Sequence, residues 1–274
     1  MPIEQGILVE NTPVAPDYYR LRLHLPKIAR LCRPGQFVEL TLSQTHDPLL
    51  PRPFSFMAAD SRDIWILYRA LGKGTGLLAK MRLDAKIRVL GPLGNGFAMP
   101  AASGRGGAAD QMVLVGGGVG IPPLHHLAAA AIASKKIAPK NIRVFLGSRS
   151  AAHLLCEKEF KKMSVSLTLV TEDGSKGSKG LVTQPLERLL RASAGASGRL
   201  WVYACGPVPM LSAVAALCEK VGIACQVSLE AMMACGFGAC LGCAVELKPQ
   251  EEGLRYATVC KDGPVFDSKD ILWR

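Results

Sequence analysis

Met233-Ala-Cys235-Gly-Phe-Gly-Ala-Cys240-Leu-Gly-Cys243 is the stretch that decides how the last quarter of this chain is built, and Cys260 follows it after sixteen residues. This spacing is that of plant-type [2Fe–2S] sites, in which four thiolates hold two irons. Gly236, Gly238 and Gly242 are expected to adopt positive φ and to bring backbone N–H groups close to the sulfurs. Such donors stabilise negative charge on a cluster. The stretch predicts a metal centre on Cys235, Cys240, Cys243 and Cys260.

Other uses of these cysteines stay open at this point. A structural zinc ion also binds four thiolates, but zinc sites usually come as two C-x2-C pairs on tight turns. A first gap filled with Gly-Phe-Gly-Ala is atypical of such pairs. Disulfides are disfavoured because the start of the chain, Met-Pro-Ile-Glu-Gln, is no signal peptide. Free structural thiols are the remaining alternative, and we give the iron–sulfur cluster more weight than all of these.

The composition is that of a folded protein with more than one domain. The chain has 274 residues, of which 49% are hydrophobic, enough for two full domains and a small appendage. No apolar run reaches the ~18 residues that span a bilayer, so we expect no membrane association. Nine cysteines without an export signal indicate a reducing compartment, and we expect a cytoplasmic protein. The net charge of +11 comes from scattered Lys and Arg, which favours anionic cofactors or an acidic partner over nucleic acid.

Residues 1–102 have the pattern of an antiparallel β-barrel. Short segments of alternating hydrophobicity are separated by turns, which is typical of small barrels. We expect strands at residues 7–11, 19–25, 36–40 and 63–68. Arg52 and Arg69 each adjoin an apolar run, and Gly74 and Thr75 open an expected helix. Each feature alone is ordinary, since such an Arg can lie on the surface and Gly-Thr can be an N-cap. Together they fit a diphosphate.

Residues 101–110 are a run of small residues that we interpret as a linker, and the expected pattern of strands and helices changes after them. A strand at 111–115, a glycine turn at 116–123 and a helix to about Ser134 form a unit that places phosphates over a helix N-terminus. Further strands and helices alternate as in a doubly wound parallel sheet, which we assign to residues 110–226. The expected strands are 142–147, 166–170 and 200–204, and the expected helices are 151–162, 183–191 and 207–221. Residues 227–274 remain as a small cluster-binding domain.

Cys205-Gly206-Pro207 follows the expected strand at 200–204, at an edge where open α/β sheets bind ligands. Cys205 can also be no more than a buried thiol.

The chain resembles the ferredoxin–NADP reductase superfamily in three motifs that occur in the same order. They are Arg52-Pro-Phe-Ser55, Gly116-Gly-Gly-Val-Gly-Ile-Pro-Pro123 and Cys205-Gly-Pro207. The cysteine-rich tail, with Cys260-Lys-Asp-Gly-Pro-Val-Phe266, narrows the resemblance to the electron-transfer subunits of NAD-linked (type B) dihydroorotate dehydrogenases of pyrimidine biosynthesis. The resemblance covers essentially the whole chain.

The resemblance implies which residues hold the cofactors. FAD would lie in the barrel and NAD in the α/β domain, with Cys205 as a catalytic residue beside the nicotinamide and the cluster on the four cysteines. The residues implied for FAD are Arg52, Pro53, Phe54, Ser55, Tyr68, Arg69, Gly74 and Thr75. The residues implied for the dinucleotide are Gly117, Gly118, Gly120 and Gly206. Phe54 departs from many relatives, which have Tyr, Ile or Leu there.

The resemblance also implies a relay and a partner. FAD exchanges hydride as well as single electrons, so it belongs between the nicotinamide and the cluster. A catalytic subunit with FMN, which oxidises dihydroorotate to orotate, would complete a heterotetramer.

One rival function is the FAD/[2Fe–2S] subunit of an NADH-dependent ferredoxin–NADP reductase or of a sulfhydrogenase. The other is a non-catalytic redox sensor or zinc-stabilised scaffold. Four cysteine ligands and the tail after Cys260 favour the dihydroorotate subunit, and the glycine turn at 116–123 counts against a sensor.

Glu172 and Asp173, which follow the expected strand at 166–170, bear on the choice between NAD(H) and NADP(H). Relatives that use NADP(H) usually carry Ser and Arg there to hold the 2′-phosphate. Carboxylates would repel that phosphate, whereas they accept a hydrogen bond from a ribose 2′-hydroxyl. NADP(H) is favoured instead by nearby residues that could hold a phosphate, namely Ser148-Arg149, Lys176 and Lys179. We give the acidic pair more weight and predict NAD(H).

Overall fold

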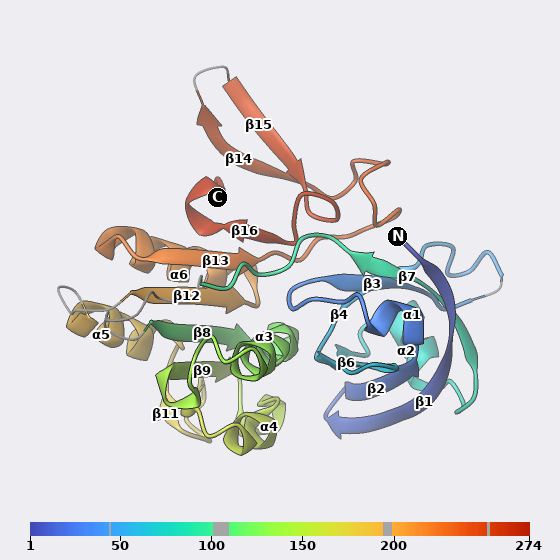
Figure 1. Ribbon diagram of the computed structural model, residues 1–274, viewed down its shortest axis with the longest axis horizontal. Coiled ribbons are helices and arrows are strands. Elements are labelled where there is room, and N and C mark those ends of the chain that lie inside the picture. Colours follow the sequence, from blue (N-terminus) through green and yellow to red (C-terminus); the bar gives the residue numbers. More distant parts are fainter. Residues whose placement is uncertain (44, 101–109, 194–198, 251–252) are drawn as a thin grey trace.

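Two seven-stranded sheets and one two-stranded sheet organise the chain in a computed structural model, which describes residues 1–43, 45–100, 110–193, 199–250 and 253–274 (Figure 1). The linker expected at residues 101–110 lies outside these residues except for Asp110. No helix in the described part of the chain combines the length and the apolarity that crossing a bilayer requires.

The first sheet is the expected antiparallel barrel. Its elements are β1 (Ile3–Ala15), β2 (Tyr18–His24), α1 (Pro26–Ala29), β3 (Phe37–Thr41), β4 (Arg52–Ser55), β5 (Ala58–Ala59), β6 (Asp63–Arg69), α2 (Lys73–Ala79) and β7 (Lys86–Leu93). The strands lie in the order β4-β3-β7-β1-β2-β6-β5. They curl around a core that includes the fully buried Leu8, Leu21, Phe56 and Ile66. Alternation builds this core, because successive side chains of a strand point to opposite faces.

The second sheet is the expected doubly wound one. Its elements are β8 (Gln111–Gly117), η1 (Gly118–Gly120), α3 (Ile121–Ala133), η2 (Pro139–Asn141), β9 (Ile142–Ser148), η3 (Ala151–His153), α4 (Glu157–Lys162), β10 (Ser166–Thr171), β11 (Ser178–Lys179), α5 (Thr183–Ser193), β12 (Leu200–Cys205), α6 (Val208–Val221) and β13 (Ala224–Ser228). Buried residues of α3 and α4 belong to one core and those of α5 and α6 to another, so the two helix pairs cover opposite faces. The order β11-β10-β9-β8-β12-β13 reverses between β8 and β12, which is where such sheets bind ligands.

One expected helix is wrong in its middle. The prediction of a single helix over 151–162 fails because Cys156 adopts a left-handed conformation with φ 58°. A non-glycine residue in that region interrupts the helix. The segment is therefore divided into η3 and α4, with Cys156 at the start of α4.

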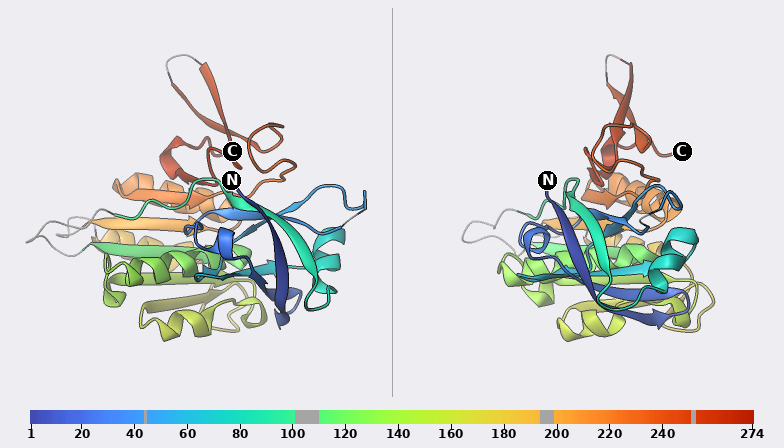
Figure 2. Two further views of the ribbon diagram at one scale, coloured as in Figure 1. Left: turned by 45° about the vertical axis from the view of Figure 1, so that its right-hand side comes forward. Right: turned by 90° about the vertical axis from the view of Figure 1, so that its right-hand side faces the viewer.

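The last segment joins both sheets. Its elements are β14 (Ala244–Gln250), β15 (Gly253–Thr258), β16 (Val265–Asp267) and η4 (Ser268–Asp270). The β14–β15 hairpin projects from the rest of the molecule, as the views in Figure 2 agree. β16 pairs antiparallel with β13 and so extends the parallel sheet. Asn95, just after β7, forms a β-bridge with Pro264, so the same segment is also attached to the exit of the barrel.

Candidate functional site

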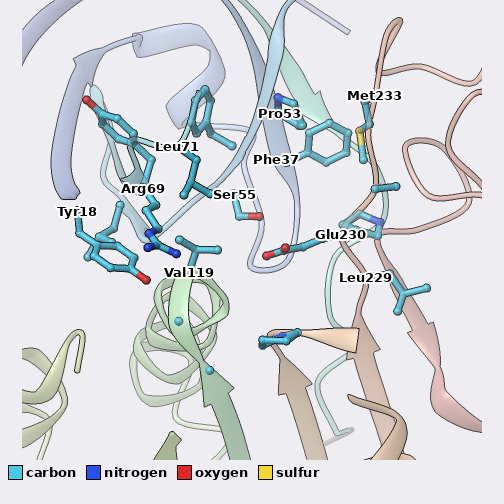
Figure 3. Close-up of a pocket in the computed structure, with 18 residues that line it drawn as sticks. Tyr18, Phe37, Pro53, Ser55, Arg69, Leu71, Val119, Leu229, Glu230 and Met233 are labelled. Atoms are coloured by element: carbon cyan, nitrogen blue, oxygen red, sulfur yellow. The ribbon is translucent and has the colours of Figure 1, made fainter. Parts of the chain in front are cut away.

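A cavity of about 390 Å³ lies where the barrel, the parallel sheet and the last segment meet (Figure 3). We call it the barrel cavity. The barrel contributes Phe37 and residues 53–55 and 67–69, and the glycine turn contributes residues 117–119. Residues 229–231 and Met233 close the remaining side. Apolar walls with a few polar groups are typical of sites that bind small cofactors.

The residues expected to bind FAD fall into two groups. Pro53, Phe54, Ser55, Tyr68 and Arg69 line the barrel cavity. Arg52, Gly74 and Thr75 do not, although a Cβ on Gly74 would lie only 3.1 Å from Nε of Arg52. Thr75 accepts hydrogen bonds from the backbone N–H groups of Leu71 and Gly72 through its hydroxyl, at 2.9 and 3.1 Å. Its side chain therefore caps the start of α2.

Tyr68 and Arg69 are held firmly on β6. The Tyr68 ring stacks on Tyr19 at 5.5 Å between centroids, and its hydroxyl donates to Oδ1 of Asn11 at 3.0 Å. Burial raises the pKa of Tyr68, so the phenol stays neutral. The guanidinium of Arg69 lies 5.5 Å above the Tyr18 ring. These contacts give the cavity one rigid aromatic wall with a positive charge at its end.

Glu230 is a site residue that the sequence analysis missed. It is the only acidic residue lining the barrel cavity in the described part of the chain, and its side chain points toward Ser55 (Figure 3). Burial raises the pKa of this carboxyl group. No motif marks Glu230. Only the sheet register, which pairs Cys205 with Ser228, shows that it lies near the carboxyl end of β12.

Cys205 is only 3% exposed and lines neither of the cavities described here. Burial, with a smaller contribution from Glu230, raises the pKa of its thiol to about 12. A thiol with such a pKa is neutral at pH 7 and is a poor nucleophile. A Cβ on Gly120 would lie 2.2 Å from the carbonyl oxygen of Cys205, so the glycine turn packs directly against β12 at this point.

A second cavity, of about 490 Å³, lies at the carboxyl ends of the parallel strands. We call it the sheet cavity. Its walls include residues 147–149 at the end of β9, Glu172 after β10, residues 180–183 and the start of α6. Tyr18, Arg69, Gly117, Gly118 and Pro207 line both cavities. Ligands in the two cavities would therefore approach each other at the glycine turn. Gly120 and Gly206 line neither cavity.

Glu172 and Asp173 have different surroundings. Glu172 lines the sheet cavity together with Ser148 and Arg149. Asp173 does not line it, because its Oδ1 accepts hydrogen bonds from the backbone N–H and the hydroxyl of Ser175, at 2.9 and 2.6 Å. These hydrogen bonds lower the pKa of Asp173. Of the expected acidic pair, the structure brings only Glu172 to the cavity.

The four cysteines of the opening motif lie together as two pairs of free thiols. The sulfur of Cys235 accepts a hydrogen bond from the Cys240 thiol, and the Cys260 thiol donates one to the sulfur of Cys243. The backbone N–H of Cys260 also points at Sγ of Cys243, at 3.4 Å. Within the described residues, no three His, Cys, Asp or Glu side chains converge enough to hold one metal ion. Two thiol pairs fit a two-iron cluster better than a single zinc ion.

The loop around Cys235 is built to hold a charged sulfur. Burial alone would raise the pKa of Cys235, but N–H groups of Phe237, Cys240 and Ala239 and the Cys240 thiol lower it to about 6. Gly236 and Gly238 have the expected positive φ, 76° and 87°. The prediction is wrong for Gly242, because Leu241 takes the left-handed conformation instead, with φ 57°. The donor set fits an iron–sulfur cluster, whose thiolates accept such N–H bonds.

Glu39 is a second residue that sequence reasoning missed. It is 1% exposed, and neither carboxyl oxygen has a hydrogen-bond partner among the described residues. It lies opposite Pro53 on the neighbouring strand, and a Cβ on Gly236 would be 2.7 Å from its Cγ. Burial, then the charge of Cys235, raises its pKa to about 7. A buried acid thus separates the cavity wall from the Cys235 loop.

The two cysteine loops also form part of the barrel cavity. Met233 lines the cavity and is two residues before Cys235, and Pro264 lines it and is four residues after Cys260. Both loops reach the surface on their other side. Cys240 is exposed, and so are the large apolar side chains of Met232, Phe237 and Leu241. Cys243 is buried.

Two family models match the chain. Residues 230–272 match the iron–sulfur cluster binding domain of dihydroorotate dehydrogenase B. Residues 114–216 match the oxidoreductase NAD-binding domain. The first match contains all four cysteines of the opening motif, and the second contains the glycine turn and Cys205.

Whole-chain comparisons agree with these matches. The chain is 34% identical to the protein from Desulforamulus reducens named dihydroorotate dehydrogenase B (NAD(+)), electron transfer subunit, over 95% of this chain and 94% of that one. The protein of the same name from Lysinibacillus sphaericus is 38% identical, over 96% of each chain. Among solved structures, the NADH-dependent reduced ferredoxin–NADP oxidoreductase, studied for flavin-based electron bifurcation, superposes with a TM-score of 0.82 at 28% identity, covering 98% of this chain and 90% of that one.

Proposed function

We propose an electron path for this chain, which belongs to the family of electron transfer subunits of dihydroorotate dehydrogenase B (NAD(+)). As a member of that family it is an oxidoreductase subunit with FAD, NAD and a [2Fe–2S] cluster as its cofactors. Electrons would move between the sheet cavity, the barrel cavity and the cysteine pairs. One observation carries this path: Met233 and Pro264 line the barrel cavity and lie two and four residues from Cys235 and Cys260.

The barrel cavity supplies the site proposed for FAD. When bound, FAD can exchange hydride with a nicotinamide and single electrons with a cluster. Tyr68 and Phe54 offer a fixed aromatic surface, with their rings 5.7 Å apart and nearly perpendicular. Glu230 and Ser55 supply the polar groups inside the cavity. We also propose Pro53 and Arg69 as FAD contacts. The phosphate groups of FAD are proposed to contact Arg52, Gly74 and Thr75.

The sheet cavity supplies the site proposed for NAD(H). Gly117 and Gly118 leave the edge of β8 open for close approach of a dinucleotide. Gly120 and Gly206 would act indirectly, by letting the glycine turn pack on β12. Glu172 is proposed to accept a hydrogen bond from the ribose, and Asp173 to hold the turn that presents Glu172. Cys205, being buried and neutral, is proposed to support the nicotinamide site by packing.

Cys235, Cys240, Cys243 and Cys260 are proposed as the cluster ligands. The N–H groups of Phe237, Ala239 and Cys240 that surround Cys235 would stabilise the charge of the reduced cluster. A catalytic partner subunit follows from the family. We propose that this partner carries FMN, oxidises dihydroorotate and forms a heterotetramer with this chain. The exposed Met232, Phe237 and Leu241 around Cys240 support a docking face at the cluster.

The division of the chain into domains and the cellular location of the protein are also proposals. We assign residues 1–102 to the FAD-binding barrel, 110–226 to the NAD-binding domain and 227–274 to the cluster-binding domain. The separate core of the barrel supports the first boundary. β13 continues to Ser228 and pairs with β16, so the last two units share a sheet. The nine cysteines are all free, which supports a reducing compartment such as the cytoplasm.

The likeness to an NADH-dependent reduced ferredoxin–NADP oxidoreductase supports the same cofactor architecture. Its identity of 28% is below the 34–38% shared with the dihydroorotate dehydrogenase subunits, so we favour the latter function. Membership of this family also speaks against a non-catalytic sensor.

Co-expression with an FMN-containing dihydroorotate dehydrogenase subunit tests the proposal. We expect the pair to co-purify and to reduce NAD⁺ with dihydroorotate, and Phe237→Asp to weaken both by placing a charge in the docking face. Leu83→Asp, at an equally apolar and exposed position of the barrel, is the control and should behave as wild type. A wild-type complex without dihydroorotate-dependent NAD⁺ reduction would contradict the function. Unchanged association of Phe237→Asp would contradict the docking face.

A further inference from the structure

The loop 258–264, which we call the ligand loop, carries Cys260 and is held as a tight turn. Oδ2 of Asp262 accepts hydrogen bonds from the backbone N–H and the hydroxyl of Thr258, at 2.7 and 2.8 Å. The carbonyl oxygen of Thr258 accepts from the backbone N–H groups of the three residues after Cys260, at 2.8–3.3 Å. Cys260 therefore has a fixed place within the loop.

Asn95 attaches this loop to the barrel. Its Nδ2 donates to the carbonyl oxygens of Lys261 and Asp262, at 3.2 and 2.9 Å, and its backbone N–H donates to that of Gly263 at 2.5 Å. Gly94 permits the close approach, because a Cβ there would lie 2.6 Å from the Gly263 carbonyl oxygen. Within the described residues, Asn95 is the only side chain outside the last segment that hydrogen-bonds to the ligand loop. Its amide group can donate twice, which suits two facing carbonyl oxygens.

The far end of the ligand loop forms part of the barrel cavity. Pro264 lines that cavity, and its carbonyl oxygen accepts a hydrogen bond from the backbone N–H of Leu229 at 2.9 Å. Leu229 precedes Glu230, the acid inside the cavity. The loop is thus fixed at Asn95 on one side and at Leu229 on the other, and both contacts determine how far Cys260 lies from the cavity.

We propose that Asn95 is a positioning residue for electron exchange between the flavin and the cluster. It keeps the ligand loop against the barrel, and so keeps the separation of the two centres short. With both cofactors bound, NADH would supply two electrons and a proton to the flavin as hydride, and the flavin would supply electrons one at a time to the oxidised cluster held by the four cysteines. This inference rests on the proposed function. A merely structural contact is the alternative, and it predicts a less stable loop with unchanged electron exchange.

Asn95→Asp is the informative variant because it keeps the shape of the side chain and removes its donors. The new carboxylate would face two carbonyl oxygens and repel them. Asn95 is exposed, so the change leaves the cores intact. Asn141→Asp, at the end of η2 on the parallel sheet, is the matched control. Asn95→Ala removes the donors without adding charge and serves as a second variant.

The test uses the purified chain with its FAD and cluster and needs no partner. Hydrogen exchange should become about tenfold faster over residues 261–263 in Asn95→Asp, the expected effect of losing the two hydrogen bonds that Nδ2 donates, and stay unchanged in Asn141→Asp. After anaerobic mixing with NADH, the flavin should be reduced at the wild-type rate while cluster reduction lags about tenfold behind. Asn95→Ala should show the same lag to a smaller extent.

Faster hydrogen exchange without a lag in cluster reduction would overturn the proposal in favour of a structural contact. Unchanged hydrogen exchange together with unchanged rates of flavin and cluster reduction would also overturn it. Loss of the cluster from Asn95→Asp would leave the decision to Asn95→Ala, where an absent lag counts against the proposal. A failure of the proposed function is distinguishable, because wild-type protein would then lack the flavin or cluster spectrum before any variant is compared.

Discussion

Replacing Glu172 by Ser should shift the preference of this chain from NADH toward NADPH. Glu172 lines the sheet cavity at the carboxyl edge of β10, beside Ser148 and Arg149. Its backbone N–H donates to the carbonyl oxygen of Ser148 at 3.0 Å, which fixes the turn. A carboxylate in this place can accept a hydrogen bond from a ribose 2′-hydroxyl but repels a 2′-phosphate.

The size of the effect follows from Coulomb's law and from the exposure of Glu172. Two like unit charges 4 Å apart repel by about 4 kcal/mol at an effective dielectric constant of 20, and by about 1 kcal/mol in bulk water. Glu172 is exposed, so the lower end of this range applies. A repulsion of about 1.4 kcal/mol corresponds to a change of about tenfold. We therefore expect Glu172→Ser to raise the NADPH-to-NADH ratio of kcat/KM about tenfold.

Asp173→Asn is the matched control for this experiment. Asp173 carries the same charge one residue further on, but its side chain is bonded to Ser175 and lies outside the cavity. Asparagine keeps an Oδ1 that can accept both hydrogen bonds from Ser175, so the turn that presents Glu172 is preserved and the ratio of kcat/KM should stay close to the wild-type value. The assay is reduction of an artificial acceptor by each nucleotide at equal FAD content. An unchanged ratio in Glu172→Ser, or an equal shift in Asp173→Asn, would refute the assignment of selectivity to Glu172.

Two further predictions concern the cluster and the pH dependence of stability. Cys240→Ser should remove the cluster absorption and the acid-labile sulfide but keep FAD and NADH–dye activity, because the barrel has its own core; retention of the cluster would contradict the ligand assignment. His126 is 9% exposed and packs against Phe56, and burial, with a smaller effect of His125, lowers its pKa to about 4. Its protonation is therefore disfavoured in the folded state, so stability is complete above pH 6.5 and falls by about 3 kcal/mol toward pH 4. In His126→Leu, the urea midpoint should change less with pH over this range. A pH dependence as steep as that of the wild type would show that other groups cause the loss of stability.

Local patterns carried most of the fold. Strands such as β9, β10 and β12 were predicted within one or two residues, because a short apolar run between turns marks a buried parallel strand wherever it occurs. The cysteine spacing predicted the iron–sulfur domain, which the match over residues 230–272 confirms, for a similar reason: the geometry of a loop around a cluster is determined over a few residues. The helix over 151–162 failed because the left-handed conformation of Cys156 depends on tertiary packing, which propensity does not contain.

Features that depend on distant segments were not predictable. No hairpin was predicted between Cys243 and Cys260, whereas β14 and β15 form one there. β16 adds an antiparallel strand to a parallel sheet, and no local signal identifies β13 as its partner. Glu230 and Glu39 were missed for the same reason. Each becomes a site residue only through the register of its strand with a neighbour, which pairs Ser228 with Cys205 and Glu39 with Pro53.

The folding of the last segment explains how one chain could hold the three proposed sites in a fixed order. β16 attaches the segment to the parallel sheet, and Asn95 and Gly94 attach it to the exit of the barrel. Any movement of the cysteine loops relative to the barrel cavity would therefore break sheet pairing, the Asn95 hydrogen bonds or both. The side of these loops that faces the cavity is fixed by the protein itself, whereas the side around the exposed Cys240 is open. With the proposed docking face around Cys240, a second subunit would reach the cysteine pairs from that open side, and the fold would separate electron exchange at the surface from electron transfer inside the chain.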